Sequence, residues 1–186
     1  MSWITTILAS NAQGRLAESY RGLVRPNGEV ANILSIHSLR PHTLEGHLAL
    51  YKATLGHGSN SLPRQLIESV AIYVSALNGC SYCVRHHFDD LREILKDDGM
   101  ADDCFVALTT DTLETAFDGG ELAALRYARK LTVSPANMVE NDLHEMRESG
   151  FGDGEILEIN QAACYTAYAN RTVLGLGVTL HGEQRY

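Results

Sequence analysis

The sequence predicts an all-α protein, and three observations support this fold class. No stretch has the strict alternation of apolar and polar residues that marks a half-buried strand. Several segments instead repeat apolar residues at the spacing of a helix face. These segments begin and end at residues typical of helix termini, with proline in a first turn or glycine after a last one. The chain is therefore expected to form a bundle of packed helices.

The predicted helices share these start and stop signals and, in chain order, cover residues 41–55, 62–78, 80–97, 120–133, 139–149 and 153–174. Ser61 is a possible N-cap of the second helix, and Gly79 ends it. The third is expected to end near Gly99. The last helix is apolar on most sides, which indicates a central position.

One domain is expected over residues 1–186, because this length suits a single hydrophobic core. Within it, residues 1–40 are predicted to be an N-terminal helical extension, with a turn at Pro26-Asn27-Gly28. Residues 41–110 carry the motif described below, and residues 119–180 supply the C-terminal helices.

Charge and hydropathy exclude several classes of partner. The formal net charge is −8, which disfavours nucleic acid and anionic membrane because both attract basic patches. No segment approaches the roughly 18 consecutive apolar residues of a membrane helix, and the N-terminus lacks the basic region of a secretory signal. A cytoplasmic location is expected, where a C-x-x-C pair is more often catalytic or metal-binding than a structural disulfide.

The stretch NGCSYCVRHH, residues 78–87, holds the most informative pattern. Cys80, Cys83 and His87 fall at i, i+3 and i+7, which places them on one face of the third predicted helix. His86 is turned away by about 100°, so it is expected to be a bystander at the surface.

The preceding helix contributes a carboxylate, Glu68, at the edge of an apolar arc. If the two helices fold back antiparallel about Gly79, Glu68 and His87 both lie roughly 12–17 Å from the turn, at 1.5 Å per residue. A weaker echo occurs later in the chain, where Glu158 precedes Asn170 by the spacing that separates Glu68 from Cys80. The echo reflects either an old duplication or chance.

Three interpretations of the cysteine pair remain open on these grounds. In a redox pair, an imidazole takes the thiol proton, a carboxylate orients the imidazole, and the second thiol captures a sulfenic acid as a disulfide. A zinc site needs four ligands, and Cys80, Cys83 and His87 supply three. The third interpretation is a pair of unreactive core cysteines, which is also what we expect of Cys104 and Cys164.

The spacing Glu68, eleven residues, Cys80-x-x-Cys83-x-x-x-His87 resembles the signature of the AhpD-like alkylhydroperoxidases, in the carboxymuconolactone decarboxylase superfamily. ALNGCSYCVRHH is similar to the "uncharacterised peroxidase-related" branch of that superfamily. So is YARKLTVSP followed by ESGFGDGEILEINQAACYTAYANR. The resemblance covers most of the chain.

The resemblance implies an AhpD-like helical bundle with the C-x-x-C at the N-terminus of a helix in an antiparallel helix pair. It implies homo-oligomers, trimers or hexamers, and a peroxidase or thiol–disulfide activity without haem or flavin, so no cofactor is expected. Carried over by position, Cys83 attacks the peroxide, Cys80 is the resolving thiol and part of the proton relay, and Glu68 and His87 complete the relay. Ser81-Tyr82 departs from the best-known members, which have a histidine between the cysteines, so we expect specificity to differ from theirs at this dipeptide.

The sequence thus predicts a thiol-dependent (hydro)peroxidase-like oxidoreductase with an antioxidant role. Its partners would be a hydroperoxide substrate and a reductant, either a small dithiol or a thioredoxin-like or lipoylated protein. Superfamily members that decarboxylate a lactone lack the cysteines, so that activity is not expected. Two different functions stay open: a disulfide reductase or redox adaptor with little peroxidase activity, and a non-enzymatic metal-binding or redox-sensing protein.

Overall fold

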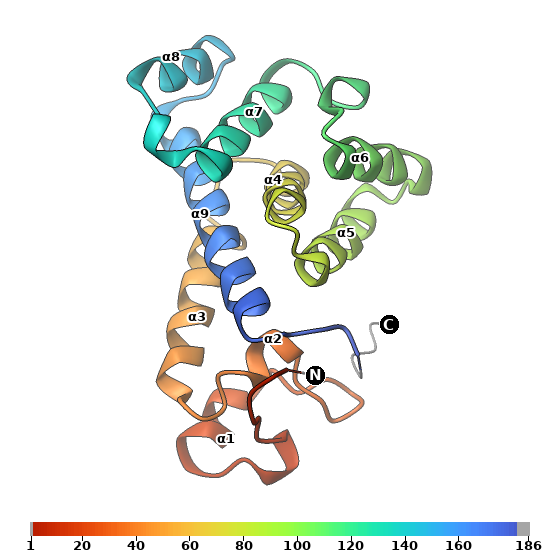
Figure 1. Cartoon of the computed structure of the whole chain (residues 1–186), viewed down its shortest axis with the longest axis vertical. Helices are drawn as coiled ribbons and strands as arrows, with labels where there is room; N and C mark the ends of the chain where they lie inside the picture. Colours follow the sequence, from red (N-terminus) through yellow and green to blue (C-terminus); the bar gives the residue numbers. More distant parts are fainter. Residues whose placement is uncertain (1, 182–186) are drawn as a thin grey trace. The chain divides into compact units, whose positions relative to one another are not determined.

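A computed structural model describes residues 2–181 of the chain, and these residues form helices and no β-strand (Figure 1). The prediction of an all-α fold is confirmed. The α-helices are α1 Gly14–Tyr20, α2 Asn32–Ser35, α3 Pro41–Thr54, α4 Arg64–Leu77, α5 Ser81–Leu95, α6 Asp98–Thr110, α7 Gly119–Val133, α8 Glu140–Glu148 and α9 Asp153–Gly175. Short 3₁₀ turns cover Ala9–Asn11, Leu113–Thr115 and Pro135–Asn137. Across the described residues, no helix combines the length and apolar character needed to cross a membrane.

The chain divides into two compact units. One is the continuous segment Ala53–Asn170, and the other combines the N-terminal segment up to Lys52 with the C-terminal segment from Arg171. The cysteine motif lies in the first of these units.

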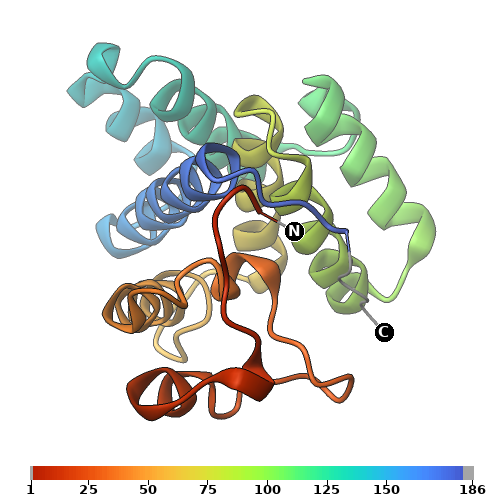
Figure 2. The ribbon, with the colours of Figure 1, turned by 60° about the horizontal axis from the view of Figure 1, so that its bottom comes forward.

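Helix α4 is the centre of the unit Ala53–Asn170. Every residue from Leu66 to Ser75 is buried, because α4 packs against α5, α6 and α7 on different sides (Figures 1 and 2). A helix buried on all sides needs apolar residues all round, and the sequence LIESVAIYVS supplies them with Glu68 as its single charged residue. The carboxylate of Glu68 is thus placed inside the core.

A tight turn reverses the chain between α4 and α5. Gly79 has φ +69°, a left-handed conformation that glycine adopts without steric cost. The N–H of Gly79 donates to Ala76 O (3.0 Å) and that of Cys80 donates to Ser75 O (2.8 Å), the pair of bonds that closes a Schellman motif. The helix pair is therefore antiparallel, and Cys80 is the N-cap residue of α5.

The start of α4 differs from the prediction that Ser61 caps it. The helix begins at Arg64 after Pro63, and the carboxylate of Glu158 on α9 accepts hydrogen bonds from the backbone N–H of Ser61 (2.9 Å) and of Leu62 (3.0 Å). A side chain remote in sequence thus binds the N–H groups that precede the helix.

The end of α5 also differs from the prediction. The helix stops at Leu95, where Lys96 adopts a left-handed conformation (φ 54°). Gly99 does not end it but lies inside α6. The reason is that the Asp97 side chain accepts a hydrogen bond from Met100 N (3.0 Å) and caps a new helix there.

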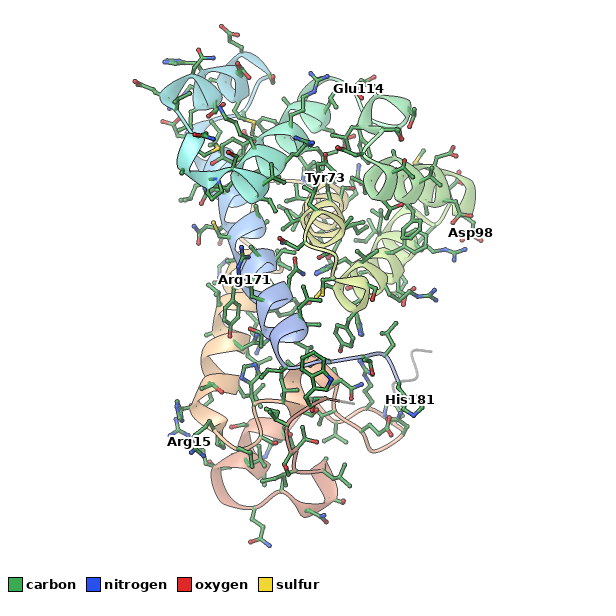
Figure 3. All side chains as sticks on the ribbon, viewed as in Figure 1. Arg15, Tyr73, Asp98, Glu114, Arg171 and His181 are labelled. Carbon is green, nitrogen blue, oxygen red and sulfur yellow. The ribbon has the colours of Figure 1, made fainter. Side chains whose placement is uncertain are left out.

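A polar contact joins α4, α6 and α7. The hydroxyl of Tyr73, whose side chain is fully buried (Figure 3), donates to Asp111 Oδ1 at the end of α6. Arg129 Nε on α7 donates to Asp111 Oδ2 at 3.2 Å. Burial first, and then the bond to the Asp111 carboxylate, raise the pKa of the Tyr73 hydroxyl above its ordinary value. Asp111 therefore links three helices.

This contact predicts a measurable coupling. Tyr73→Phe should lower the free energy of unfolding by about 1–2 kcal/mol, because a partner of a charged acceptor is lost. Urea unfolding of Tyr73→Phe, Asp111→Ala and the double variant forms a double-mutant cycle. Strictly additive losses would contradict the coupling.

The second unit has its own core, formed by Leu16, Tyr20, Val30 and Leu44. Beside it, the buried rings of His37 and His47 lie 5.2 Å apart, and His37 Nδ1 is 2.8 Å from Thr43 Oγ1. Burial, with a smaller contribution from His37, lowers the pKa of His47 to about 4. His47 is therefore a group that folds in its neutral form.

Acid should destabilise this unit through His47. Below an unfolded-state pKa of about 6.5 the unfolded chain binds a proton that the folded chain rejects, so stability falls as the pH falls from about 6.5 to about 4. The loss attributable to His47 should be about 3 kcal/mol. His47→Gln should remove this part of the pH dependence in denaturant unfolding, whereas a change at the exposed His144 should not. Parallel profiles for wild type and His47→Gln would refute the assignment.

Candidate functional site

The structure brings Glu68 and His87 together across the helix pair. Glu68 Oε2 and His87 Nδ1 are 2.7 Å apart, and the Glu68 side chain is 4% exposed. The sequence pattern placed Glu68 at the edge of an apolar arc, but it lies inside the core. His87 belongs to α5 and is partly buried. Glu68 and His87 therefore lie at a similar distance from the turn at Gly79, as expected for an antiparallel helix pair.

Glu68 has a second partner that the sequence reasoning missed. Arg64 Nη2, one turn earlier on α4, is 3.4 Å from Glu68 Oε1. A buried carboxylate is costly unless it is paired, and here each oxygen has a cationic or hydrogen-bonding neighbour. The i, i+4 spacing of Arg64 and Glu68 was the available signal.

The two thiols are in direct contact at the start of α5. Cys80 Sγ and Cys83 Sγ are 2.9 Å apart, both side chains are buried, and both are free thiols. A disulfide has a sulfur separation of about 2.05 Å, so a shift of roughly 1 Å joins them. Oxidation of the pair would need little movement of the backbone.

The surroundings favour the thiolate form at Cys80. The hydrogen bond with the Cys83 thiol is the largest influence that lowers the pKa of Cys80. Burial raises this pKa, and the Cys83 backbone N–H, the Asn170 side chain and the charge of His87 lower it further. The same sulfur–sulfur bond, with burial, raises the pKa of Cys83. The bond between the sulfurs is symmetric by itself. The Cys83 N–H and His87 break the symmetry, because both act on Cys80.

Asn170 on α9 is a further residue of the site. Its Nδ2 donates to Ser75 Oγ (3.0 Å), and its Oδ1 accepts from Asn78 Nδ2 (2.9 Å). The side chain is fully buried, and it lowers the pKa of both thiols. The echo in which Glu158 precedes Asn170 was its only sequence signal. Glu158 and Asn170 contact the segments before and after α4, so this part of α9 runs parallel to α4.

His86 and Tyr82 form a separate contact on α5. Their ring centroids are 4.4 Å apart, and Tyr82 is buried. His86 is partly buried against this ring, not a surface residue as expected. It nevertheless points to Tyr82, while His87 alone of the two bonds to Glu68.

The remaining cysteines lie away from the pair. Cys104 is partly buried on α6, in agreement with a packing role, but Cys164 is exposed. Cys164 was expected in the core because cysteine is a small apolar residue that is more often buried than a ligand. Helix α9 keeps an exposed side that also carries Leu157, which is 59% exposed.

A pocket of about 490 Å³ opens beside the first cysteine. Residues from the end of α4, the start of α5 and α6 line it: Ala76, Gly79, Cys80, Ser81, Val84, Arg85, Phe88, Phe105 and Thr109. The rings of Phe88 and Phe105 lie 4.3 Å apart. Arg85, which is 2.9 Å from Asp89, is the charged residue of the lining. The pocket is therefore mostly apolar, and its lining includes Cys80, whose side chain is buried.

One group within the described residues has the spacing of a metal site. Potential ligand atoms of Glu68, His87 and Asp90 lie within 4.8 Å of one another. This group includes neither Cys80 nor Cys83, so it differs from the thiolate zinc site considered from the sequence. It offers three ligands, one fewer than a closed structural zinc site requires.

Comparison with known proteins identifies relatives of this arrangement. Residues 41–130 match the Carboxymuconolactone decarboxylase family. The uncharacterized protein YdfG of Bacillus subtilis (strain 168) is 27% identical over 116 residues, 62% of this chain and 74% of YdfG.

Solved structures share the fold at low identity. The alkylhydroperoxidase AhpD core of an uncharacterized peroxidase-related protein from Ralstonia eutropha JMP134 has a TM-score of 0.83 at 22% identity, over 96% of this chain and 91% of that chain. A variant of the debrominase Bmp8, in complex with 2,3,4-tribromopyrrole, has a TM-score of 0.76 at 19% identity, over 98% and 95%. The fold is therefore AhpD-like.

The role of Asn170 can be tested through thiol reactivity. Asn170→Ala removes an amide that favours the thiolate, so the inflection in the pH dependence of Cys80 alkylation should move to higher pH. Alkylation at pH 7 should slow several-fold, as followed by mass spectrometry of the Cys80 peptide. Asn160→Ala is the matched control, because Asn160 is an amide of α9 that bonds to Tyr127 Oη (2.9 Å) instead. Equal profiles for the two variants would count against the assignment.

Proposed function

Because residues 41–130 belong to the carboxymuconolactone decarboxylase family and the chain has the AhpD-like fold, we propose that this protein is a thiol-dependent peroxidase-like oxidoreductase. The resemblance to this superfamily seen in the sequence is thereby confirmed. The observation that carries the proposed activity is the contact of two free thiols, Cys80 and Cys83, at 2.9 Å beside a buried Glu68–His87 pair.

The proposed reaction oxidises the thiol pair and reduces a hydroperoxide by two electrons. One thiolate attacks the terminal oxygen of ROOH, the O–O bond breaks, and a sulfenic acid and an alkoxide form. The alkoxide takes the proton given up by the thiol and leaves as the alcohol ROH. The second thiol then displaces water from the sulfenic acid and closes a disulfide. An external dithiol reduces this disulfide by exchange.

Glu68 and His87 supply the proton path in this proposal. Glu68 holds Nδ1 of His87, which leaves Nε2 as the ring atom that exchanges a proton with a thiol. The carboxylate stabilises the imidazolium once it forms, as a buried acid does in hydrolytic triads. Arg64 pairs with the other carboxylate oxygen of Glu68, Oε1.

The partners belong to the same proposal. The reductant is a small dithiol or a thioredoxin-like or lipoylated protein, and the assembly is a homo-oligomer, a trimer or a hexamer. The family resemblance supports both. Leu157 and Tyr168 are exposed on α9 and, about three helical turns apart, share one side of it. An exposed apolar side of this kind is compatible with assembly.

A second candidate is reductive dehalogenation, which the likeness to the debrominase Bmp8 favours. It would use the same dithiol as its source of two electrons. The remaining candidates are a disulfide reductase or redox adaptor and a protein that holds a metal through its thiols.

A thiol count separates these candidates. Reduced protein given one equivalent of cumene hydroperoxide should lose two of its four thiols and recover them with dithiothreitol. Cys83→Ser should abolish steady-state peroxide consumption with a dithiol donor, and Cys104→Ser should leave it unchanged.

Other outcomes would indicate the alternative functions. Thiols that are not oxidised by peroxide but reduce a model disulfide would indicate a disulfide reductase or redox adaptor. Release of bromide from tribromopyrrole would indicate dehalogenation, and stoichiometric zinc bound by thiols would exclude the redox cycle.

The proton path has its own test. Glu68→Gln should lower kcat about 10²- to 10⁴-fold, the usual contribution of positioned acid–base groups, while the fold is retained because the two side chains have similar shape. Steady-state kinetics would be compared with Glu93→Gln, a change at an exposed carboxylate on α5. A kcat within a factor of two of wild type for Glu68→Gln would rule out the relay.

A further inference from the structure

Three possible metal ligands lie together at the proton path of the site. Glu68 on α4 and His87 and Asp90 on α5 place potential ligand atoms within 4.8 Å of one another. We propose that these residues bind one Zn²⁺ ion and that the bound ion reversibly inhibits the thiol pair. The binding site stands on its own geometry, whereas the inhibition rests on the proposed function.

The antiparallel helix pair aligns the three ligands. His87 and Asp90 are three residues apart on α5, so they share one face of that helix. Glu68 faces them from α4, with its Oε2 2.7 Å from His87 Nδ1. Two atoms that ligate one tetrahedral zinc ion lie about 3.3 Å apart, at bond lengths of about 2.0–2.1 Å. The three side chains therefore reach a common ion with shifts of about 1.5 Å or less.

The kinds of donor atom in this group favour zinc over the harder cations. An imidazole nitrogen and carboxylate oxygens are both ordinary zinc ligands. Ca²⁺ takes about six to eight oxygen ligands, and Mg²⁺ requires near-octahedral coordination by oxygen. Three protein ligands leave the fourth position of a tetrahedral zinc ion to water. The ion is therefore held less firmly than in a closed structural site, as reversible inhibition requires.

The charges and the burial of the group also favour a cation. Glu68 and Asp90 supply two carboxylates, whereas Arg64 is the cation that pairs with Glu68, at 3.4 Å from Oε1. The Arg64 side chain is 63% exposed, so solvent screens its charge. Its contact leaves Oε2 for a metal and orients the carboxylate, as hydrogen bonds to ligating carboxylates do. Glu68 is buried but His87 and Asp90 are partly exposed, so an ion can enter beside them.

Zinc bound here would interrupt the proton path at either ring nitrogen of His87. Coordination at Nδ1 replaces the hydrogen bond to Glu68. Coordination at Nε2 occupies the atom that exchanges a proton with a thiol. In both cases His87 no longer accepts the thiol proton, so the reactive thiolate forms more slowly. The loss of rate should approach that of Glu68→Gln, about 10²- to 10⁴-fold.

Zinc binding can be measured without the thiols. With all four cysteines changed to serine, titration against a chromophoric zinc chelator should show one Zn²⁺ per chain. Asp90→Asn and Glu68→Gln should each weaken this affinity about 10-fold or more, because a ligand is lost. Asp89→Asn is the matched control, since Asp89 is an equally partly buried neighbour that pairs with Arg85 at 2.9 Å. It should change the affinity less than about 2-fold.

The site would be overturned if the folded serine variant bound no zinc, or if Asp90→Asn and Asp89→Asn had equal affinities. Circular dichroism shows whether each variant is folded. If the serine variant does not fold, the two aspartate variants are compared in the wild-type chain. Asp90→Asn should then bind one zinc ion fewer than Asp89→Asn, and equal stoichiometry would refute the site.

The inhibition is tested in single turnovers of reduced wild type, freed of dithiol because dithiols themselves bind zinc. Saturating Zn²⁺ should slow the loss of thiols to cumene hydroperoxide about 10-fold or more, and EDTA should restore the rate. The zinc concentration for half-inhibition should rise about 10-fold or more in Asp90→Asn and less than about 2-fold in Asp89→Asn.

The outcomes separate this proposal from the proposed function. Equal half-inhibition concentrations in Asp90→Asn and Asp89→Asn would overturn the inhibition through His87. Wild type that loses no thiols to peroxide in the absence of zinc would refute the proposed function. The titration of the serine variant would still decide whether the site binds zinc.

Discussion

The hydrogen bond between the Glu68 carboxylate and His87 is the contact on which the site depends. It joins α4 to α5 across the turn at Gly79, so Glu68 and His87 must lie at the same distance from that turn. A carboxylate in the core costs free energy unless it is paired, so the fold that buries α4 on all sides also requires this partner. The thiols at the start of α5 are then held at a set position relative to the imidazole.

The two thiols of the site differ in pKa because a few neighbouring groups act on one sulfur and not on the other. The two sulfurs are chemically identical and share one hydrogen bond, so that bond alone cannot decide which of them ionises. Two groups act on Cys80 alone, the backbone N–H of Cys83 and the charge of His87, and both lower the pKa of the Cys80 thiol. Asn170 adds a donor from α9 that serves both sulfurs. The pKa of Cys80 is thus lowered, and that of Cys83 raised, by groups at the start of α5.

Most of the helices and the four motif residues were predictable, because their signals are local. Helix periodicity, the Gly79 turn and the spacing of Glu68, Cys80, Cys83 and His87 all lie within about twenty residues of chain. Glu158 and Asn170 were not predictable as partners of α4, since they lie more than ninety positions away from the groups they bind. Asp97 was a local cap signal that Gly99 obscured. Which cysteine faces a pocket was also beyond the sequence, because α6 supplies the far wall.

The turn at Gly79 makes the length of the chain around it inflexible. Each residue added to or removed from a helix rotates what precedes it by about 100° and shifts it by about 1.5 Å. A single insertion between Glu68 and the turn would therefore rotate the carboxylate away from His87. The connection between α4 and α5 could not compensate, because the two Schellman hydrogen bonds fix its length and conformation. Insertions that preserve the site belong instead in the connections before α4 and after α6. Natural variation in length should therefore avoid the segment from Glu68 to His87.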